Sequence, residues 1–321
     1  MTARTVRDAV FTRRVSANEQ LYLSISRAFS HLVMQVVVEG QGTIAAEQVQ
    51  LALDQVSVHF PGVRLTLRRN KWVADATAPR VTLLPNYPDF HSGLNRSIHL
   101  YDVFRPELGR TCEVALARNG NNTILVFRAL HAVMDGQGLR QWVKAVFQAL
   151  RGEAISPAVS PLTEDEFIRS RNAAIRRDEP VVPRCAGPPA SARSFEKDYS
   201  FDYARRTVRG PIPGITARLA EAARKLLCLD AGDTSIVMVP VDLRLGTPEI
   251  SGSTANLSLP LFVRVDSADD WMEISQKLLR QLEAERHMAI GMSAITCCGR
   301  DSRRSASSCP ASTALSTSPI S

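Results

Sequence analysis

The chain has 321 residues, of which 45% are hydrophobic and 22% are charged, and its formal net charge is +7. These proportions are typical of a soluble globular protein with a hydrophobic core. No run approaches the roughly 18 apolar residues that a membrane-spanning helix needs. Residues 1–14 are rich in arginine, but no apolar run follows them. We therefore expect no membrane span, no secretory signal and a cytoplasmic location.

The cysteines and the basic charge exclude two further classes of site. The only close pair among the six cysteines, Cys297 and Cys298, is adjacent rather than spaced two apart, which suits neither a zinc site nor a redox motif. The positive charges are spread along the chain, without the basic helix or aromatic-interleaved patch of nucleic-acid binding. They favour either an ordinary solvated surface or an anionic partner, namely a phosphate-bearing cofactor or an acidic carrier protein.

The first half of the chain alternates strand-like and helix-like patterns. A β-branched run that ends at Gly40 predicts a buried strand over residues 32–40. Asn119 and Gly120 form a hairpin-turn signal between two later apolar runs. We expect helices over residues 43–58 and 139–150, and further strands over residues 63–67, 71–73, 112–117 and 123–129.

Prolines punctuate the middle of the chain, and a second block with regular patterns follows. We predict a crossover linker with one helix over residues 163–177, which begins at a capping box formed by Thr163 and Glu166. In the second block we expect helices over residues 215–227 and 271–287, and strands over residues 235–241 and 259–265. Because strands and helices alternate in both blocks, we predict an α/β fold with mixed sheets.

The segment Leu130–Gly136 carries the pattern H-x-x-x-D-G and offers the strongest candidate for a catalytic site. His131 lies where a predicted strand passes into a loop, and rigidly held loops often carry catalytic groups. A neutral imidazole can take a proton from a hydroxyl, amine or thiol as that group attacks an acyl carbonyl. Asp135 is expected to fix the loop, and Gly136 to allow a backbone turn that a side chain would obstruct.

Two other roles for His131 and Asp135 are weighed against this one. The pair could ligate a metal, but no third ligand is suggested by the remaining histidines, so we expect no metal. A structural histidine with satisfied hydrogen bonds is the other alternative, because the pattern alone is common.

Residues 127–138 resemble the HHxxxDG motif of the superfamily that holds chloramphenicol acetyltransferase, peptide-synthetase condensation domains and plant-type alcohol acyltransferases. Residues 60–64, Phe-Pro-Gly-Val-Arg, resemble the family's early H-P-x-L-R segment. Residues 240–244, Pro-Val-Asp-Leu-Arg, with Gly252 and residues 256–261 after them, are similar to its V-D-x-R and G-N segment. The three matches occur in the family's order and span most of residues 20–290.

The resemblance implies an α/β fold of two chloramphenicol-acetyltransferase-like halves with mixed sheets and a channel between them, the second half being incomplete. It implies that His131 is the general base, and that Asp135 is structural and pairs with an arginine of the second half. Arg244 matches that arginine best, a surface arginine being the alternative, and would support the site together with Gly136. Asn256 would line the substrate channel, an ordinary turn asparagine being the alternative.

The implied reaction moves an acyl group from a thioester to a hydroxyl or amine acceptor, without a bound cofactor. The donor is acyl-CoA or an acyl group on the phosphopantetheine arm of an acyl carrier protein. The expected division of the chain is an N-terminal half with the motif, a crossover linker, a partial C-terminal half and a tail, over residues 1–155, 156–213, 214–292 and 293–321.

Two departures from the family pattern affect this expectation. Leu130 stands where the family has the first histidine of its motif, and the family's closing DFGWG segment does not follow the helix that is expected to end near His287. Residues 293–321 are serine-rich, and we expect a disordered tail or an out-of-frame continuation. The rival functions are an inactive, truncated member that acts as an interaction protein, and a peptide-synthetase-type condensation that forms amides.

Overall fold

The computed structural model describes residues 10–28, 32–84, 104–171, 209–226 and 234–288. The predictions for most of the linker and for the tail lie outside the described residues. None of the described helices is long and apolar enough to cross a membrane. The elements alternate as predicted, in the order β1 (Thr12–Arg14), α1 (Ala17–Ala28), β2 (Val33–Gln41), α2 (Ala46–His59), η1 (Pro61–Val63), β3 (Thr66–Arg68), β4 (Lys71–Val73), β5 (Val81–Leu83), η3 (Pro106–Leu108), β6 (Cys112–Asn119), β7 (Asn122–Leu130), α3 (Gly136–Leu150), α4 (Glu164–Ser170), α5 (Ile215–Leu226), β8 (Ser235–Asp242), α6 (Pro248–Ser251), β9 (Ser258–Val265) and α7 (Trp271–Glu283).

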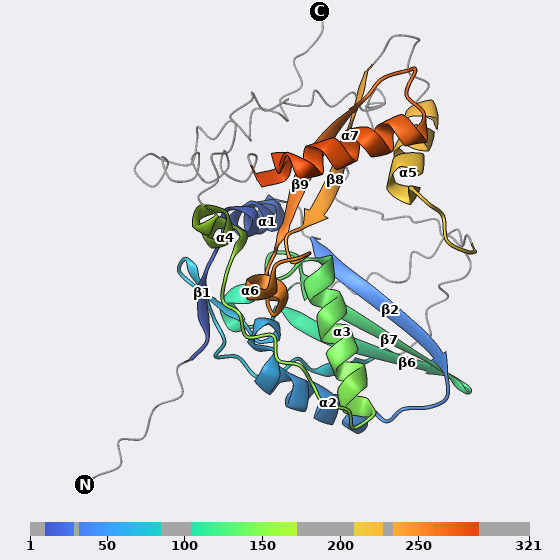
Figure 1. Cartoon of the computed structure of the whole chain (residues 1–321). Helices are drawn as coiled ribbons and strands as arrows, with labels where there is room; N and C mark the ends of the chain where they lie inside the picture. The colour runs from blue at the N-terminus through green and yellow to red at the C-terminus, as the bar shows by residue number, and fades with distance from the viewer. Residues whose placement is uncertain (1–9, 29–31, 85–103, 172–208, 227–233, 289–321) are drawn as a thin grey trace, which may run out of the picture.

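The central sheet has the strand order β2-β7-β6-β5. Strand β7 pairs antiparallel with both β2 and β6, whereas β5 pairs parallel with β6, so the sheet is mixed as predicted. After Asn122 every residue of β7 is buried, because strands lie on both its sides and helices α2 and α3 lie over the sheet (Figure 1). The residue that follows β7, His131, is therefore attached to the end of a rigid, fully packed strand.

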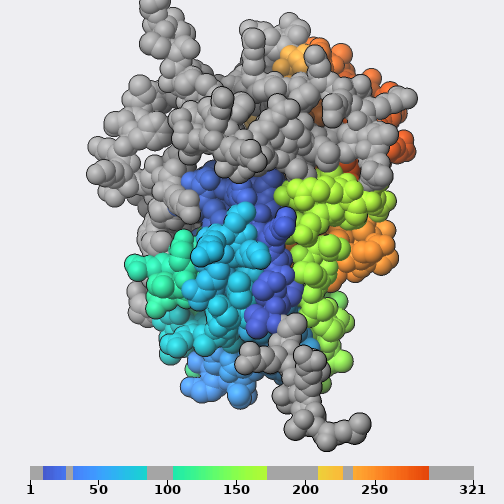
Figure 2. All heavy atoms as spheres, turned by 90° about the vertical axis from the view of Figure 1, so that its left-hand side faces the viewer, coloured from blue at the N-terminus to red at the C-terminus, as the bar shows by residue number. Residues whose placement is uncertain are grey.

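A small sheet of order β1-β4-β3 and helix α1 complete the first half. Neither β1 nor α1 was predicted, and Pro61–Val63 is a 3-10 turn where a strand was expected to begin. Figure 2 shows the N-terminal segment, in dark blue, lying between the cyan hairpin and the yellow-green segment that leads to α4. Two carboxylates of α4 explain the second contact, because Glu164 Oε1 and Asp165 Oδ2 accept hydrogen bonds from the first backbone N–H groups of α1.

The second half is smaller in its described part. Strands β8 and β9 pair antiparallel over their full length, and helices α5 and α7 pack against them (Figure 1). Asp270 caps α7 by accepting hydrogen bonds from Met272 N and Glu273 N. The turn between β8 and β9, residues 243–257, extends away from this ribbon and reaches the motif of the first half.

Candidate active site

The motif loop, defined here as residues 131–135, connects the end of β7 to the start of α3. The backbone N–H of His131 donates to the carbonyl of Leu32 at 2.9 Å, which continues the β2–β7 ladder by one step. The N–H of Val133 then closes a tight turn onto the carbonyl of Leu130 at 2.9 Å. His131 is half-buried, whereas the next four residues are buried. The imidazole is therefore the accessible group of an otherwise packed loop.

Asp135 ends the loop as the N-cap of α3 and accepts three hydrogen bonds. Its Oδ1 accepts from the N–H of Gly138 at 2.8 Å, as expected of an N-cap aspartate. Its Oδ2 accepts from Arg244 Nη1 at 2.9 Å and from the N–H of Leu257 at 2.8 Å. Two of these donors belong to the second half of the chain, so one carboxylate ties the loop to its own helix and to residues more than 100 positions away.

Arg244 is buried, and each of its three guanidinium nitrogens donates to at least one acceptor. Besides Asp135 it binds Asp242 Oδ1 at 2.9 Å, and it donates to the carbonyls of Ser253 at 2.9 Å and Ala255 at 2.7 Å. A buried charge needs such compensation, because taking it from water is costly. Arg244 therefore holds the 243–257 turn together through the carbonyls of Ser253 and Ala255, and joins that turn to the motif loop through Asp135.

Asn256 holds His131 at two points. Its Nδ2 donates to the backbone carbonyl of His131 at 2.8 Å, and its Oδ1 lies 3.2 Å from Nδ1 of the imidazole. A carbonyl can only accept, so the amide nitrogen must face it and the amide oxygen must face the ring. Nδ1 then carries the proton, and Nε2 of a neutral imidazole is left as a proton acceptor. Asn256 is 1% exposed, so it is a packed partner of the histidine.

Tyr22 of α1 packs against the imidazole and was missed in the sequence. The two rings are stacked, with centroids 4.0 Å apart and an interplanar angle of 17°. Burial raises the pKa of the Tyr22 phenol, and the charges of Asp135 and Glu164 raise it further, so the phenol stays neutral. Stacking on an imidazole needs no particular sequence spacing, so no sequence pattern pointed to this role of Tyr22.

A close backbone approach accompanies these contacts. A Cβ at Gly138 would lie 2.4 Å from the carbonyl oxygen of Thr254, and a Cβ at Gly62 would lie 2.0 Å from Thr254 Oγ1. Nothing lies within 4 Å of a Cβ at Gly136, and its φ is not positive. The expectation that Gly136 avoids an obstruction is therefore wrong. The steric demand falls two residues later, because the 243–257 turn rests on Gly138.

The structure thus brings together four of the predicted residues, namely His131, Asp135, Arg244 and Asn256. The arrangement fixes one tautomer of a half-buried imidazole, in which Nε2 is the nitrogen that can accept a proton. Leu130, in place of the family's first histidine, is buried at 5% exposure. Among the described residues no group of three or more His, Cys, Asp or Glu side chains could hold a metal ion.

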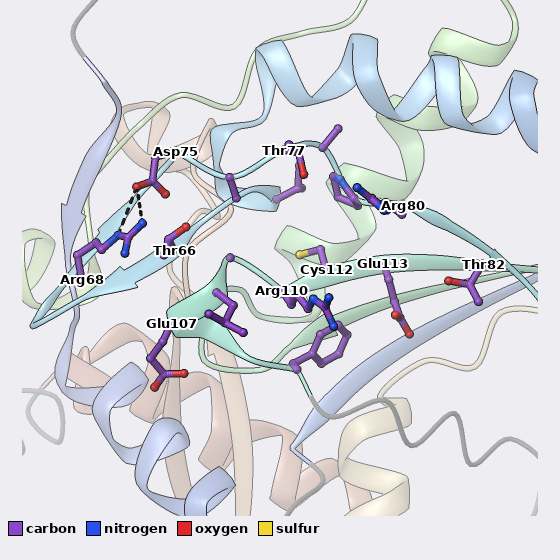
Figure 3. A pocket seen from close by; sticks show the side chains of 17 residues that line it. Thr66, Arg68, Asp75, Thr77, Arg80, Thr82, Glu107, Arg110, Cys112 and Glu113 are labelled. Atoms are coloured by element: carbon purple, nitrogen blue, oxygen red, sulfur yellow. Dashed lines mark hydrogen bonds and ion pairs between the residues drawn. The ribbon is translucent and has the colours of Figure 1, made fainter.

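A cavity of about 640 Å³ lies elsewhere in the first half (Figure 3). Strand β3, residues 75–82, η3 and the start of β6 line it, and no residue of the motif loop or of the 243–257 turn does. At one end Arg68 forms an ion pair with Asp75. A hydrogen bond from Thr66, and next the contact with Arg68, lower the pKa of the Asp75 carboxyl. The buried thiol of Cys112 lies at its wall, and burial raises its pKa. The cavity does not contribute to the site at His131.

No protein-family model and no curated protein sequence matches the chain, but solved structures do. TRI101 of F. sporotrichioides complexed with coenzyme A and T-2 aligns with a TM-score of 0.58 at 12% identity, over 88% of this chain and 77% of that chain. The starter condensation domain of rhizomide synthetase RzmA, a mutant in complex with C8-CoA and Leu-SNAC, aligns at 0.56 and 13% identity, over 87% and 72%. The X-domain in complex with OxyB, from teicoplanin biosynthesis, aligns at 0.53 and 15% identity, over 90% and 72%.

These similarities define the fold. The chain has the mixed α/β fold shared by condensation domains and TRI101, as the sequence predicted. At such low identity the likeness extends to the architecture and not to the chemistry.

Proposed function

We propose that the chain is an acyltransferase and that His131 is its general base. The hydrogen bonds between Asn256 and His131 carry the proposal, because they prepare the ring tautomer that proton abstraction needs. With the proton on Nδ1, Nε2 is the nitrogen that can accept the proton of an attacking hydroxyl or amine.

The proposed reaction uses an acyl thioester as donor and a hydroxyl or amine as acceptor. His131 Nε2 takes the acceptor's proton while the acceptor's oxygen or nitrogen attacks the thioester carbonyl. The tetrahedral intermediate then collapses, the carbon–sulfur bond breaks, and the imidazolium returns the proton to the departing thiolate. No covalent intermediate on the protein is involved, so neither serine nor cysteine is required as a nucleophile.

Asp135 and Arg244 act through His131 in this proposal. They do not contact the reacting atoms, but their buried pair joins the motif loop to the 243–257 turn that carries Asn256. Such outer contacts keep a catalytic group within the narrow range of positions that the reaction tolerates. Leu130 is turned into the core, which is consistent with a supporting role for that position.

Coenzyme A and carrier-protein phosphopantetheine are both candidates for the thiol of the donor. The fold neighbours offer a starting point, since TRI101 was solved with coenzyme A and the RzmA starter condensation domain with C8-CoA. We therefore propose acyl-CoA donors for the first assays and acyl carrier proteins for the second. An amine acceptor would give the amide-forming condensation that is the related alternative.

The test measures release of free thiol from a panel of acyl-CoA and acyl-carrier-protein donors, with hydroxyl and amine acceptors. His131→Ala is expected to lower the rate by about 10²–10⁴-fold, the usual contribution of a general base. His59→Ala is the matched control, because His59 lies at the end of α2, and it should keep the parent rate. Equal background rates in the parent and His131→Ala would refute the proposal and favour the inactive interaction protein.

A further inference from the structure

A second buried arginine reaches the motif loop from the opposite end of the chain. Arg13 of β1 donates from Nη2 to the backbone carbonyl of Val133 at 2.8 Å. Val133 is the middle residue of the motif loop and is itself fully buried. The carbonyl of Val133 therefore depends on this contact, since a buried backbone oxygen without a donor is costly.

The charge of Arg13 is balanced by Glu19 of α1. Arg13 Nη1 forms an ion pair with Glu19 Oε1, and both side chains are almost completely buried. The other carboxylate oxygen, Oε2, accepts from Trp72 Nε1 at 3.0 Å and from the N–H of Ser16 at 3.1 Å. The guanidinium carbon of Arg13 also lies 5.9 Å from the centroid of the Trp72 ring. All the partners of this pair lie in the first half.

Glu19 also caps the N-terminus of α1. Ser16 Oγ accepts from the N–H of Glu19 at 3.3 Å while Glu19 accepts from the N–H of Ser16, so the two residues form a reciprocal capping box. The same helix carries Tyr22, which stacks on His131. Arg13 and Glu19 thus fix both the motif loop and the helix that packs on its histidine.

We propose that Arg13 is a positioning residue for His131, and that it holds the motif loop at Val133 as Arg244 holds it at Asp135. This inference rests on the proposed function only where it predicts the rate of acyl transfer. The contact between Arg13 and Val133 can be tested without turnover. The planar guanidinium can donate to Val133 and to Glu19 at once, and a lysine ammonium is too compact to reproduce both contacts.

Two variants separate positioning from folding. Arg13→Lys keeps the positive charge that balances Glu19, but it loses the planar guanidinium that reaches Glu19 and Val133 at once. In Arg13→Met with Glu19→Gln both charges are removed together, which avoids leaving one of them buried without a partner. In that double variant the glutamine oxygen can still accept from Ser16 and Trp72. The matched control is Arg128→Met with Glu113→Gln, a part-buried ion pair that joins β6 to β7.

The first measurement is amide hydrogen exchange by NMR. The N–H groups of His131 and Val133 are expected to exchange about tenfold faster in both Arg13 variants than in the parent, because the loop opens locally more often. The N–H of Leu257, held by Asp135 from the other side, should change much less. The control pair should leave all three amides at the parent rates.

The second measurement is steady-state kinetics of acyl transfer. Arg13→Lys is expected to lower kcat about tenfold with KM within about twofold of the parent, as misplacement of a catalytic group predicts. Parent-like exchange of His131 and Val133 in a folded Arg13→Lys protein would overturn the inference whatever the rate. A parent without turnover would instead overturn the proposed function, and the exchange comparison would still decide the role of Arg13.

Discussion

Replacing Asp135 by asparagine removes one charge and keeps the shape of the side chain. All three partners of Asp135 are donors, namely Gly138 N, Leu257 N and Arg244 Nη1. An asparagine has one accepting oxygen, so its NH₂ group must face at least one N–H group at about the same distance. The substitution therefore breaks a hydrogen bond and also leaves Arg244 with reduced compensation.

The size of the effect follows from burial. Side-chain exposure is 6% for Asp135 and 5% for Arg244, so water cannot replace the lost contacts. Removing one partner of a buried pair typically costs about 3–5 kcal/mol, a large part of the 5–15 kcal/mol by which domains are usually stable. For a chain of this size we expect the Tm to fall by roughly 10 °C.

Urea unfolding followed by tryptophan fluorescence is a suitable assay, because Trp72 and Trp142 report on the first half and Trp271 on the second. Asp75→Asn is the control, since Asp75 forms an exposed pair with Arg68 and should cost less than about 1 kcal/mol. A free energy of unfolding for Asp135→Asn within about 0.5 kcal/mol of the parent would contradict the importance assigned to the buried pair.

Three further predictions use other contacts of the site. Gly138→Ala should lower the free energy of unfolding in urea by about 1–3 kcal/mol, because its methyl group would overlap the backbone carbonyl of Thr254. Gly136→Ala, the control, should be neutral or stabilising. Equal effects of the two substitutions would contradict the close approach at Gly138. Asn256→Ala should lower kcat about tenfold or more and give mixed ring tautomers in ¹⁵N NMR spectra of His131; a single unchanged tautomer would contradict the role of the amide. Burial, and next the charge of a neighbouring carboxylate, raise the pKa of Glu164 to about 8, above the 4.5 of the unfolded chain. The parent should therefore lose stability as the pH rises from about 4.5 to about 8, because over that range the unfolded chain has released a proton that the folded state still holds, and Glu164→Gln should flatten that slope.

Much of the fold could be predicted because its elements are long and periodic. The hairpin of β6 and β7 follows from two apolar runs and the Asn-Gly signal between them. Its two loop residues are Gly120 and Asn121, because Asn119 pairs with Asn122, and Gly120 has a positive φ of 57°. The capping box at Thr163 also forms as expected. In these places a local pattern and the tertiary structure favour the same conformation.

The parts that could not be predicted depend on contacts between distant segments. Strand β1 has three residues, too few for a periodic pattern, and it is fixed by pairing with β4. Arg13 and Glu19 read as ordinary surface charges, because only the folded chain brings Trp72 and Val133 to them. A local signal did exist for α1, since Ser16 and Glu19 have the spacing of a capping box.

Within the site, the sequence pointed to His131, Asp135, Arg244 and Asn256 through the family resemblance, but it did not indicate how they bind one another. Tyr22 was missed because stacking on an imidazole leaves no spacing pattern. The sequence motif predicted that Gly136 must lack a side chain. The position without room for a Cβ is instead Gly138, where α3 meets the 243–257 turn.

The distance along the chain between His131 and Asn256, 125 positions, has a consequence for folding kinetics. Contacts between residues so far apart form slowly, because a long loop must close before they contribute any free energy. The β6–β7 hairpin, a local contact, can form before the contact between His131 and Asn256, with the imidazole still free to rotate and to exchange tautomers. In a refolding experiment the single-tautomer signal of His131 should therefore appear in the slowest phase, after the fluorescence of Trp72 and Trp142 has reached its native value.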